Sequence, residues 1–519
     1  MSTTLVALIL VPLTVLIAFH QRSRSSIRHV RGPPSPSWFY GHMRQLTLAP
    51  TYGYFEFQWL KAFGPVYRFK GCFGQNRLMV SDPVAFQYIF NSPHFALSPT
   101  TQNTVALVFG EGNLMGIRAG KLHKRLRNEF NAAFTAAAVR GYFPIFEKVA
   151  QAISQELEAK SSAAEELQEV IDVVPLLNAV TLGAIAEAAL GCTAEDLGSE
   201  YVAANAEIMA AASNQSPLQL LADALLALLP SSVLRLFLLL PTKTLNAARK
   251  SNTLARSIGS RVIGRKEELM KSGVDVRTDV FGGLLDPERT ETRLTREEII
   301  TQTPIVMVAG QETTTNTLSF ALWELAKNPA LQDSLRAEIH QLSNGGNFAY
   351  DKMPLLNAFI KEALRFYPSE AFTERMVTRD TVLPLSESIT TSTGEEVKQI
   401  PLQEGQVVVV GVASYQRIQS RWGEDAHEFR PSRWLEGSIA KGDAVGPYAN
   451  LLSFLGGPHT CLGWRFAIME MQVVLCELVG KFSFSLSEEH PIRVGIANTL
   501  QPTMRDGGKG VPLKVTRVL

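Results

Sequence analysis

The feature that most constrains the fold is a helical pattern of unusual length near the middle of the chain. It starts at Thr295 with the letters TREE, a capping box in which the threonine begins a helix and Glu298 closes its first turn. The pattern runs to about Lys327, where Asn328 and Pro329 stop it. At ~1.5 Å per residue, roughly 32 residues cross nearly the whole of a globular domain.

The rest of the chain favours a mainly α fold with small peripheral β-sheets. Residues 120–345 are mostly helical in pattern, and a hairpin is expected before them from the runs VYRFKG and NRLMVSD. Short strands return over 376–413, notably in GQVVVVGV, before a further helix and an irregular β region. No repeats appear and no linker divides the chain, so we expect one domain over 43–519.

Composition and charge argue against nucleic acid as a partner. The chain has 519 residues, of which 46% are hydrophobic and 19% charged, with a formal net charge of +1. These values describe a well-buried globular protein without a dominant electrostatic partner.

The N-terminus carries the one targeting signal. Residues 5–19 are uncharged and nearly all apolar, and with their flanks they approach the ~20 residues that a membrane-spanning helix needs. A cleavable signal peptide is the alternative, but no basic region precedes the run, whereas arginines follow it. We expect a single-pass membrane anchor at 1–21 in the endoplasmic reticulum, a basic and proline-rich neck at 22–42, and a cytoplasmic globule in contact with membrane lipid. The sequon at Asn214 would matter only in a secretory lumen.

A lone cysteine lies in a turn built from glycines and a proline, within the letters FLGGPHTCLGWRFA. This residue, Cys461, comes just ahead of a helical pattern that begins at Trp464. Aligned N–H groups and the positive end of a helix dipole favour a thiolate at such a position. We therefore expect the sulfur of Cys461 to be ionised.

Three chemistries are open to this thiolate. A nucleophile would need a nearby general base, and His459 is a poor candidate; a zinc ion would need further ligands at short spacing, which are missing. Haem iron needs only one axial thiolate. The other cysteines, Cys72, Cys192 and Cys476, are irregularly spaced and are interpreted as small buried hydrophobes.

The loop is similar to the haem-binding loop of the cytochrome P450 family. The similarity rests on the spacing of Phe454, Gly457, His459, Cys461 and Gly463. It implies that these residues bind haem b, with Cys461 as the axial ligand of the iron. The family usually has arginine where His459 stands, so His459 is expected to donate a hydrogen bond to a haem propionate and to carry charge only when protonated.

A second signature precedes the loop in the order typical of the family. The letters KEALRFYP contain Glu362 and Arg365, which lie on one face of a helix at spacing i, i+3. A surface ion pair is the ordinary explanation of such spacing. However, FRPSRW follows, and its Arg433 resembles the third member of the family's Glu-Arg-Arg network. The resemblance implies a buried cluster of these three residues that braces the cysteine loop.

The long helix carries a third signature, AGQETT, from Ala309 to Thr314. Small residues here let a flat ligand lie close to the backbone. Thr313 could simply bond back to its own helix. The resemblance implies instead that Thr313 hydrogen-bonds dioxygen or its water and that Glu312 belongs to the proton-delivery path. Pro304 removes one backbone bond and is expected to distort the helix nearby.

A fourth segment, GKLHKRLRNEFNAAF, resembles the family's segment that crosses a haem edge. His123 stands where the family has tryptophan, and Arg127 lies one helical turn later. Arg375, in FTERMV, is similar to another propionate partner. Solvated surface positions are the alternative for both arginines. Basic residues over 121–125 could present a docking surface or simply a solvated face.

The resemblance implies a haem-thiolate monooxygenase that covers residues 43–519. Such an enzyme takes electrons from NADPH through an NADPH-cytochrome reductase and inserts one atom of O2 into a hydrophobic small molecule. The apolar character of the expected pocket favours a terpenoid, steroid, fatty acid or aromatic hydrocarbon, and a fungal-like N-terminus suggests secondary-metabolite tailoring. The alternatives are a haem-thiolate isomerase or dehydratase, which would not need Glu312 and Thr313, and a non-enzymatic haem sensor or electron carrier.

Overall fold

A computed structural model describes most of the chain after its N-terminus. The expected anchor at 1–21, the sequon residue Asn214 and the leucine-rich run at 228–239 lie outside the described residues. The described ranges are 26–162, 170–213, 215–227, 240–286, 294–344, 347–348, 350–437, 439 and 444–518.

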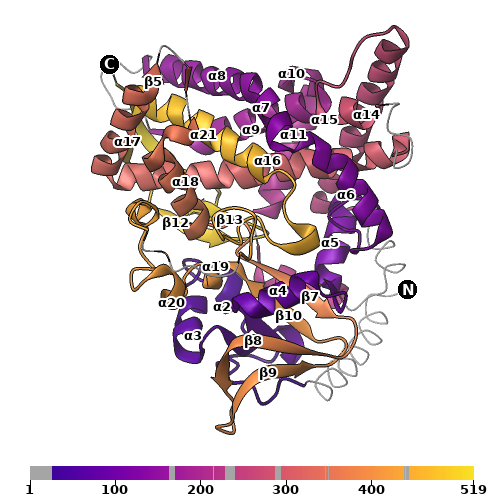
Figure 1. The fold of residues 1–519 in the computed structure, drawn as a ribbon, viewed down its shortest axis with the longest axis vertical. Helices are drawn as coiled ribbons and strands as arrows, with labels where there is room; N and C mark the ends of the chain where they lie inside the picture. The colour runs from indigo at the N-terminus through magenta and orange to yellow at the C-terminus, as the bar shows by residue number, and fades with distance from the viewer. Residues whose placement is uncertain are drawn as a thin grey trace.

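Helix α16 (Arg296–Lys327) crosses the helical half of the molecule, as predicted (Figure 1). The capping box is present, because the Thr295 side chain accepts from the N–H of Glu298 and the Glu298 carboxylate accepts from the N–H of Thr295 at 2.8 Å. Asn328 caps the C-terminus. The expected distortion at Pro304 does not interrupt the helix.

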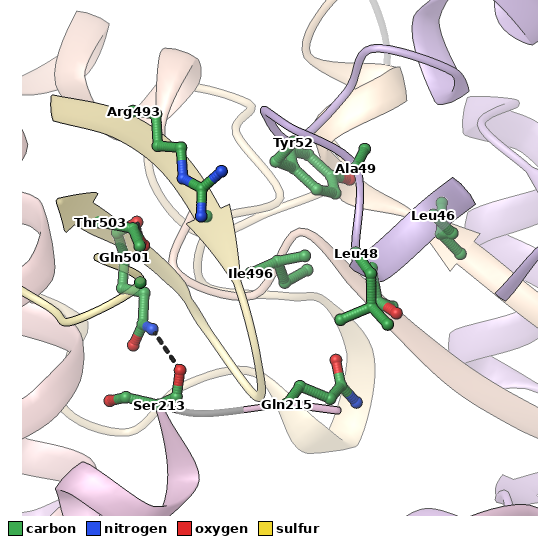
Figure 2. Close-up of a pocket in the computed structure, with 13 residues that line it drawn as sticks. Leu46, Leu48, Ala49, Tyr52, Ser213, Gln215, Arg493, Ile496, Gln501 and Thr503 are labelled. Carbon is green, nitrogen blue, oxygen red and sulfur yellow. Dashed lines mark hydrogen bonds between the residues drawn. The ribbon is translucent and has the colours of Figure 1, made fainter. Parts of the chain in front are cut away.

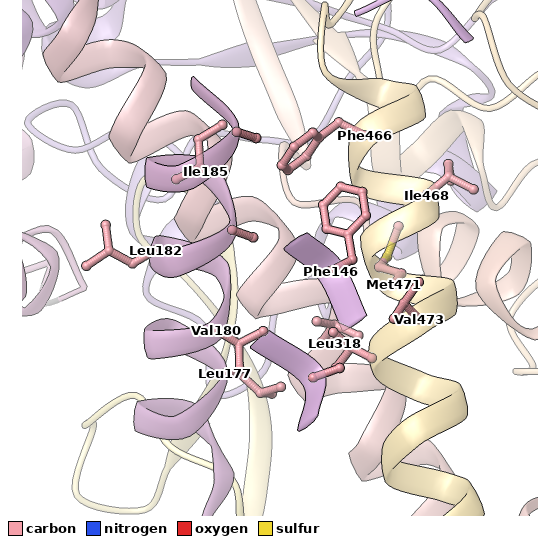
Figure 3. Packing of buried hydrophobic residues seen from close by; sticks show 14 of the residues in the cluster. Phe146, Leu177, Val180, Leu182, Ile185, Leu318, Phe466, Ile468, Met471 and Val473 are labelled. Atoms are coloured by element: carbon pink, nitrogen blue, oxygen red, sulfur yellow. The ribbon is translucent and has the colours of Figure 1, made fainter. Parts of the chain in front are cut away.

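Three helices pack against α16 and one another to form the main core. They are α8 (Phe143–Ser162), α9 (Val173–Leu190) and α21 (Trp464–Lys481), whose apolar side chains meet in Figure 3. The rings of Phe146 and Phe466 pack edge to face with centroids 4.7 Å apart. Among the described residues α9 is the one helix long and apolar enough to span a membrane, and 78% of it is buried inside the protein. Its burial is that of a core helix.

Further helices surround this core and the sheets. They are α2 (Met43–Thr47), α3 (Glu56–Phe63), α4 (Pro83–Asn91), α5 (Pro99–Phe109), α6 (Lys121–Ala133), α7 (Ala136–Gly141), α10 (Ala194–Leu197), α11 (Ser199–Ala212), α12 (Pro217–Leu226), α14 (Lys243–Lys271), α15 (Val280–Leu284), α17 (Pro329–Leu342), α18 (Pro354–Phe366), α19 (Val412–Tyr415) and α20 (Gln419–Trp422).

The largest sheet lies at the opposite end of the molecule from α8 and α17 (Figure 1). Its order is β1 (Val66–Lys70), β2 (Asn76–Val80), β10 (Val407–Gly411), β7 (Phe372–Val377) and β3 (Phe95–Leu97). The predicted β1–β2 hairpin is confirmed, and β10, the strand expected in GQVVVVGV, pairs parallel with β2. The β7–β10 pairing fixes the backbone around Arg375, which lies opposite Val408.

Four small sheets complete the described part of the fold, which is mainly α with small separate sheets as expected. They are β11 (Phe482–Leu486) with β14 (Pro512–Arg517) and β4 (Val170–Asp172), β12 (Ile492–Ile496) with β13 (Leu500–Met504), β8 (Thr381–Thr390) with β9 (Glu396–Leu402), and β5 (Ser343–Asn344) with β6 (Asn347–Phe348).

The described part of the expected neck packs onto the globule. Ile27 and Val30 are fully buried in the apolar cluster under the large sheet. The N–H of Arg68, in β1, donates to the carbonyl of Arg31 at 2.9 Å. Residues 26–32 are therefore held by the sheet region of the globule.

Candidate functional site

The cysteine loop is fixed by backbone geometry immediately before α21. The N–H of Cys461 donates to the carbonyl of Phe454 at 2.8 Å, which closes the loop. Gly457 has φ of +65°, and a β-carbon there would lie 2.8 Å from Cβ of Phe90 on α4. Glycine is thus required at 457 by the turn and by close packing. A β-carbon at Gly463 would meet only Phe134, at 3.9 Å, so the described protein leaves room beside that residue.

The thiol of Cys461 faces a space inside the protein. It is accessible to solvent, yet protein surrounds it closely enough that burial raises its pKa above the ordinary value, against the opposing effects of the Gly463 N–H and the Arg127 guanidinium. In the protein without haem, burial therefore opposes the ionisation that the helix N-terminus favours. A metal that binds the sulfur supplies the missing stabilisation, because coordination deprotonates a thiol outright.

Helix α16 has an accessible stretch at its middle, in contrast to its buried flanks. Ala309 is exposed and Thr313 is partly buried, although the residues on either side of this stretch are mostly buried. Gly310 points elsewhere: a β-carbon there would lie 2.5 Å from Ile185 of α9, so this glycine serves helix packing. Of the two small residues expected to admit a flat ligand, only Ala309 faces open space.

A short loop links this stretch of α16 to the cysteine. The hydroxyl of Ser369 donates to the carbonyl of Thr313 at 3.0 Å. The next residue, Glu370, lies close enough to Cys461 for its charge to act on the thiol and to Arg375 for the two charges to interact. Burial raises the pKa of Glu370, which Arg375 opposes.

Four basic side chains gather beside the cysteine loop. The rings of His123 and His459 lie with centroids 4.4 Å apart. Arg127, on α6, donates to the carbonyl of Thr460. Burial, together with the nearby His123, Arg375 and Arg127, lowers the pKa of His459 to about 3. The predicted residues from α6, β7 and the loop are thus brought together.

This basic group lacks a full set of anionic partners. Arg375 is only 5% exposed, so its placement at the solvated surface is excluded. Its guanidinium donates to the hydroxyl of Thr373 at 3.0 Å and to the carbonyl of Glu374 at 2.9 Å. Within the described ranges neither Arg375 nor Arg127 makes a salt bridge. Buried cations without partners are costly, so the group fits a ligand that brings carboxylates, such as the propionates of haem.

The predicted Glu-Arg-Arg network forms a closed and fully buried cluster. Arg365 donates two parallel hydrogen bonds of 2.8 Å to the carboxylate of Glu362, and Arg433 adds a third at 3.0 Å. The indole of Trp434 and the N–H of Arg430 also donate to this carboxylate, at 2.9 and 2.7 Å. Although burial acts to raise the pKa of Glu362, the bonds and charges of Arg365 and its neighbours lower it overall. The surface interpretation of the Glu-x-x-Arg pair is thereby excluded.

A glutamine connects this cluster to the cysteine loop, and sequence reasoning missed it. The side chain of Gln416 is completely buried and donates to the carbonyl of Arg365 at 2.8 Å. Its oxygen accepts from the N–H of Leu452 at 2.9 Å and from the hydroxyl of Ser453 at 3.1 Å. Ser453 immediately precedes Phe454, so the brace reaches the loop through this amide. No local pattern around Gln416 marks it in the sequence.

The two polar residues of the AGQETT motif have different partners. The hydroxyl of Thr313 donates to the carbonyl of Ala309 at 3.0 Å, the back-bonding that was the alternative for this residue. Glu312 accepts a hydrogen bond of 3.0 Å from the hydroxyl of Thr499, in the turn between β12 and β13. The contact between Thr499 and Glu312 is a second one that the sequence did not predict.

A separate pocket lies on the other side of the β12–β13 hairpin (Figure 2). It has a volume of about 190 Å³ and is lined by α2, the end of α11 and the hairpin. The amide of Gln501 crosses it to donate to the carbonyl of Ser213 at 2.9 Å. It shares none of the residues around Cys461, so we do not assign the chemistry to it.

Comparison with known proteins agrees with this geometry. The family model for cytochrome P450 matches residues 31–502. The chain therefore belongs to the cytochrome P450 family and is a haem b-dependent monooxygenase. It is 30% identical to cytochrome P450 monooxygenase 91 of the fungus Postia placenta, over 95% of this chain and 94% of that protein. It is 29% identical to cytochrome P450 monooxygenase claP of Ampulloclitocybe clavipes, over 94% of this chain and 93% of that protein.

Proposed function

We propose that this enzyme inserts one oxygen atom from O2 into a hydrophobic small molecule, with electrons from NADPH delivered by a reductase. The observation that carries the proposal is an exposed cysteine, Cys461, placed beside a basic group whose two arginines form no salt bridge within the described residues. Haem b supplies both the metal for the sulfur and the carboxylates for the basic group. When bound, it supplies the activation of dioxygen.

The residues around the cysteine loop would hold the cofactor. Cys461 is the proposed axial ligand, and Arg127, Arg375, His123 and His459 are the proposed propionate partners. The histidine pair differs from the two arginines because burial keeps both rings neutral, so each offers a hydrogen bond rather than a charge. Phe454, Gly457 and Gly463 shape the loop in which the sulfur sits.

Glu312 and Thr313 would manage protons on the α16 side. The Thr313 hydroxyl donates its hydrogen bond to the carbonyl of Ala309, so the hydroxyl oxygen can still accept a hydrogen bond from water. Glu312 is held by Thr499 and can carry a proton at its carboxyl oxygens. Together they would orient water and deliver protons during the reaction.

The proposed surroundings of the enzyme are the cytoplasmic face of the endoplasmic reticulum. Residues 1–21 would form a single-pass anchor in the lipid, as their apolar composition supports. Lys121 and Lys124 are exposed on α6, the helix that also carries Arg127, and would help to dock the reductase. A tailoring step in secondary metabolism, for example on a terpenoid, is the proposed role.

Thiolate ligation has a spectroscopic test. The reduced holoenzyme with carbon monoxide should show the red-shifted absorption of thiolate-bound haem. Cys461→Ala should lose this band, whereas the control Cys192→Ala should keep it, because Cys192 is a partly buried cysteine outside the loop. A normal band in folded, haem-loaded Cys461→Ala would overturn the assignment of the ligand.

The reaction has its own test. Reductase-supplied enzyme with NADPH is incubated with an extract of the host's lipophilic metabolites, and mass spectrometry follows a product heavier by one oxygen. Label from ¹⁸O2 should enter that product. A product that forms without oxygen or NADPH would favour an isomerase or dehydratase instead.

A further inference from the structure

The pocket beside the β12–β13 hairpin has two walls that both reach the middle of α16 (Figure 2). One wall is the hairpin, whose turn carries Thr499, the hydrogen-bond donor to Glu312 at 3.0 Å. The other wall is the end of α11, and on this helix the amide of Asn205 donates to Oε1 of Gln311 at 2.7 Å. The pocket thus lies where two elements that contact consecutive residues of the AGQETT motif come together.

Printed hydrogen bonds hold the sides of the pocket to one another. The amide nitrogen of Gln501, on β13, donates to the carbonyl of Ser213, at the end of α11, at 2.9 Å (Figure 2). The segment after α2 is joined to the hairpin as well, because the N–H of Tyr52 donates to the carbonyl of Val494 at 2.7 Å. The pocket is therefore a cavity with fixed walls.

Arg493 is the one charged side chain among the described residues that line the pocket. Its guanidinium donates to the neutral carbonyl of Pro50 at 3.2 Å, and within the described ranges it forms no salt bridge. A guanidinium carries five N–H donors in a fork that matches the two oxygens of a carboxylate. Because no acidic side chain lines the described pocket, the lining favours a ligand that carries a carboxylate.

Two amide oxygens that belong to lining residues lack a hydrogen-bond donor in the described protein. They are the Oε1 atoms of Gln215 and Gln501, and both atoms are shielded from solvent. The whole side chain of Gln501 is only 2% exposed. A buried acceptor without a donor is unfavourable, so these oxygens favour a ligand that also brings a hydroxyl group.

The rest of the lining and the size of the pocket set the remainder of the ligand. The volume of about 190 Å³ is smaller than the ~300 Å³ at which pockets for drug-sized ligands begin, so the ligand is small. A short hydrocarbon chain suits the apolar lining residues, which are Leu46, Leu48, Ala49 and Ile496.

We propose that this pocket is a second ligand site, separate from the haem site, that binds a short-chain hydroxy carboxylic acid. The carboxylate pairs with Arg493, the hydroxyl donates to a glutamine oxygen, and the chain lies against Leu48 and Ile496. Because both walls contact α16, occupation of the pocket changes ligand affinity at the haem site. Binding in the pocket does not depend on the proposed reaction, since no step of that reaction takes place there.

Binding is measured by titration calorimetry on the holoenzyme, with 3-hydroxyoctanoate as the probe. Excess 4-phenylimidazole first occupies the haem iron, so that the heat reports a site elsewhere. Octane-1,3-diol lacks the charge and should bind roughly tenfold more weakly or worse, whereas octanoate lacks the hydroxyl and should bind roughly threefold more weakly. Equal binding of the three compounds would overturn the proposal.

Variants connect this binding to the named residues. Arg493→Gln should lower the affinity for 3-hydroxyoctanoate to that for the diol, and Gln215→Leu should remove the preference for 3-hydroxyoctanoate over octanoate. Arg505→Gln is the matched control, because Arg505 is an exposed arginine next to the end of β13 that does not line the pocket. All variants should keep the carbon monoxide band, which separates this test from that of Cys461. Equal losses in the two arginine variants would contradict a specific site.

The place of binding has a direct test. A 3-hydroxyoctanoate analogue that carries a diazirine is irradiated with the holoenzyme, and mass spectrometry locates the labelled peptides. Label should appear in peptides that contain residues 46–52 or 493–503, and it should be lost in Arg493→Gln. Label confined to other peptides would overturn the proposal.

The link to the haem site is tested through the affinity of 4-phenylimidazole for the iron, followed in the haem spectrum. We expect saturating 3-hydroxyoctanoate to change this affinity by about fivefold or more in wild type, and the azole to change the affinity for the acid by the same factor. At the same concentration of acid, Arg493→Gln should show no change. An unchanged azole affinity in wild type would overturn the link, and a change that persists in Arg493→Gln would place the acid in the haem site instead.

Discussion

Two groups of buried basic residues lie close to the cysteine loop, and they differ in how their charge is balanced. In the first, Arg365 and Arg433 share the carboxylate of Glu362 through bonds of 2.8 to 3.0 Å. In the second, Arg127 and Arg375 bond only to neutral oxygens of Thr460, Thr373 and Glu374. Arg365, Arg433 and Arg375 are buried and Arg127 is partly buried, so the two groups differ chiefly in their partners.

The contrast separates a structural role from a binding role. A buried carboxylate with five hydrogen bonds needs no further partner from a ligand, and it holds α18 against the segment 425–434. A buried guanidinium such as Arg375, which forms no salt bridge within the described residues despite the nearby Glu370, is unfavourable until a carboxylate binds it. The closed group should therefore matter to folding with or without haem, and the open group mainly to the binding of haem.

The largest expected effect comes from opening the closed group. Glu362→Ala leaves Arg365 and Arg433 buried without their acid, which typically costs about 3 to 5 kcal/mol. We expect little soluble, haem-loaded protein and a large fall in the denaturant midpoint. Glu436→Ala, which removes an exposed partner of Arg430, is the control and should change stability by less than about 1 kcal/mol. Equal behaviour of the two variants would contradict the distinction between the groups.

The second prediction concerns the open group. Arg375→Met removes a buried cation that forms no salt bridge in the described part of the chain, although Glu370 interacts with it at longer range, so the haem-free chain should lose little stability. Haem retention should fall by roughly tenfold or more, the value of a hydrogen bond to a charged group, as followed by transfer of haem to apomyoglobin. Arg375→Lys keeps the charge and should lie between. A haem-free chain that is strongly destabilised by Arg375→Met would show that this arginine serves folding instead.

The third prediction addresses the link between the closed group and the loop. Gln416→Ala leaves the N–H of Leu452 without its partner and removes one of two side-chain donors to the carbonyl of Arg365, at an expected cost of about 1 to 3 kcal/mol. The carbon monoxide band should decay faster to the form without thiolate. The exposed Gln419→Ala offers a control with little effect. If both variants keep the band equally well, the loop does not depend on this brace.

The smallest effect is expected from a third kind of buried group, an acid without a basic partner. Glu470 on α21 is fully buried, and burial raises its pKa well above the ordinary value, which the Thr314 hydroxyl opposes only in part. Above about pH 4.3, the ordinary value of a glutamate, the unfolded chain releases this proton while the folded chain keeps it. Stability contributed by this site is therefore complete at low pH and lost as pH rises.

Glu470→Gln should remove this dependence, because the amide does not titrate. We expect the melting temperature of the variant, relative to that of wild type, to increase from pH 5 to pH 8, as measured by calorimetry on the holoenzyme. Glu477→Gln, on the same helix but paired with Lys481, is the control. A variant that loses on wild type as the pH rises would show that Glu470 is ionised in the folded protein.

Local chemistry made the long helix and the Glu-Arg-Arg cluster predictable. The capping box at Thr295 and the stop at Asn328 each depend on residues that are neighbours in the sequence, and the helix of the structure ends at these two positions. The cluster needed the resemblance as well, because spacing i, i+3 describes surface pairs equally well.

Contacts between distant segments could not be predicted in the same way. Gln416 and Thr499 act through partners far along the chain, and nothing in their neighbours marks them. The orientation of Gly310 depends on which face α9 covers. The raised pKa of Cys461 in the haem-free protein depends on how much protein surrounds the sulfur, which the sequence does not show.

The pairing of β4 with β14 bears on how the enzyme is made. The N–H of Val511 donates to the carboxylate of Asp172 across 339 positions of the chain. Synthesis proceeds from the N-terminus, so β4 and the start of α9 must wait for the last segment before this contact can form. The cysteine loop and Thr499 also belong to that late segment. A chain that ends before β14 would thus contain most of the core residues but could not form the β4–β14 pairing.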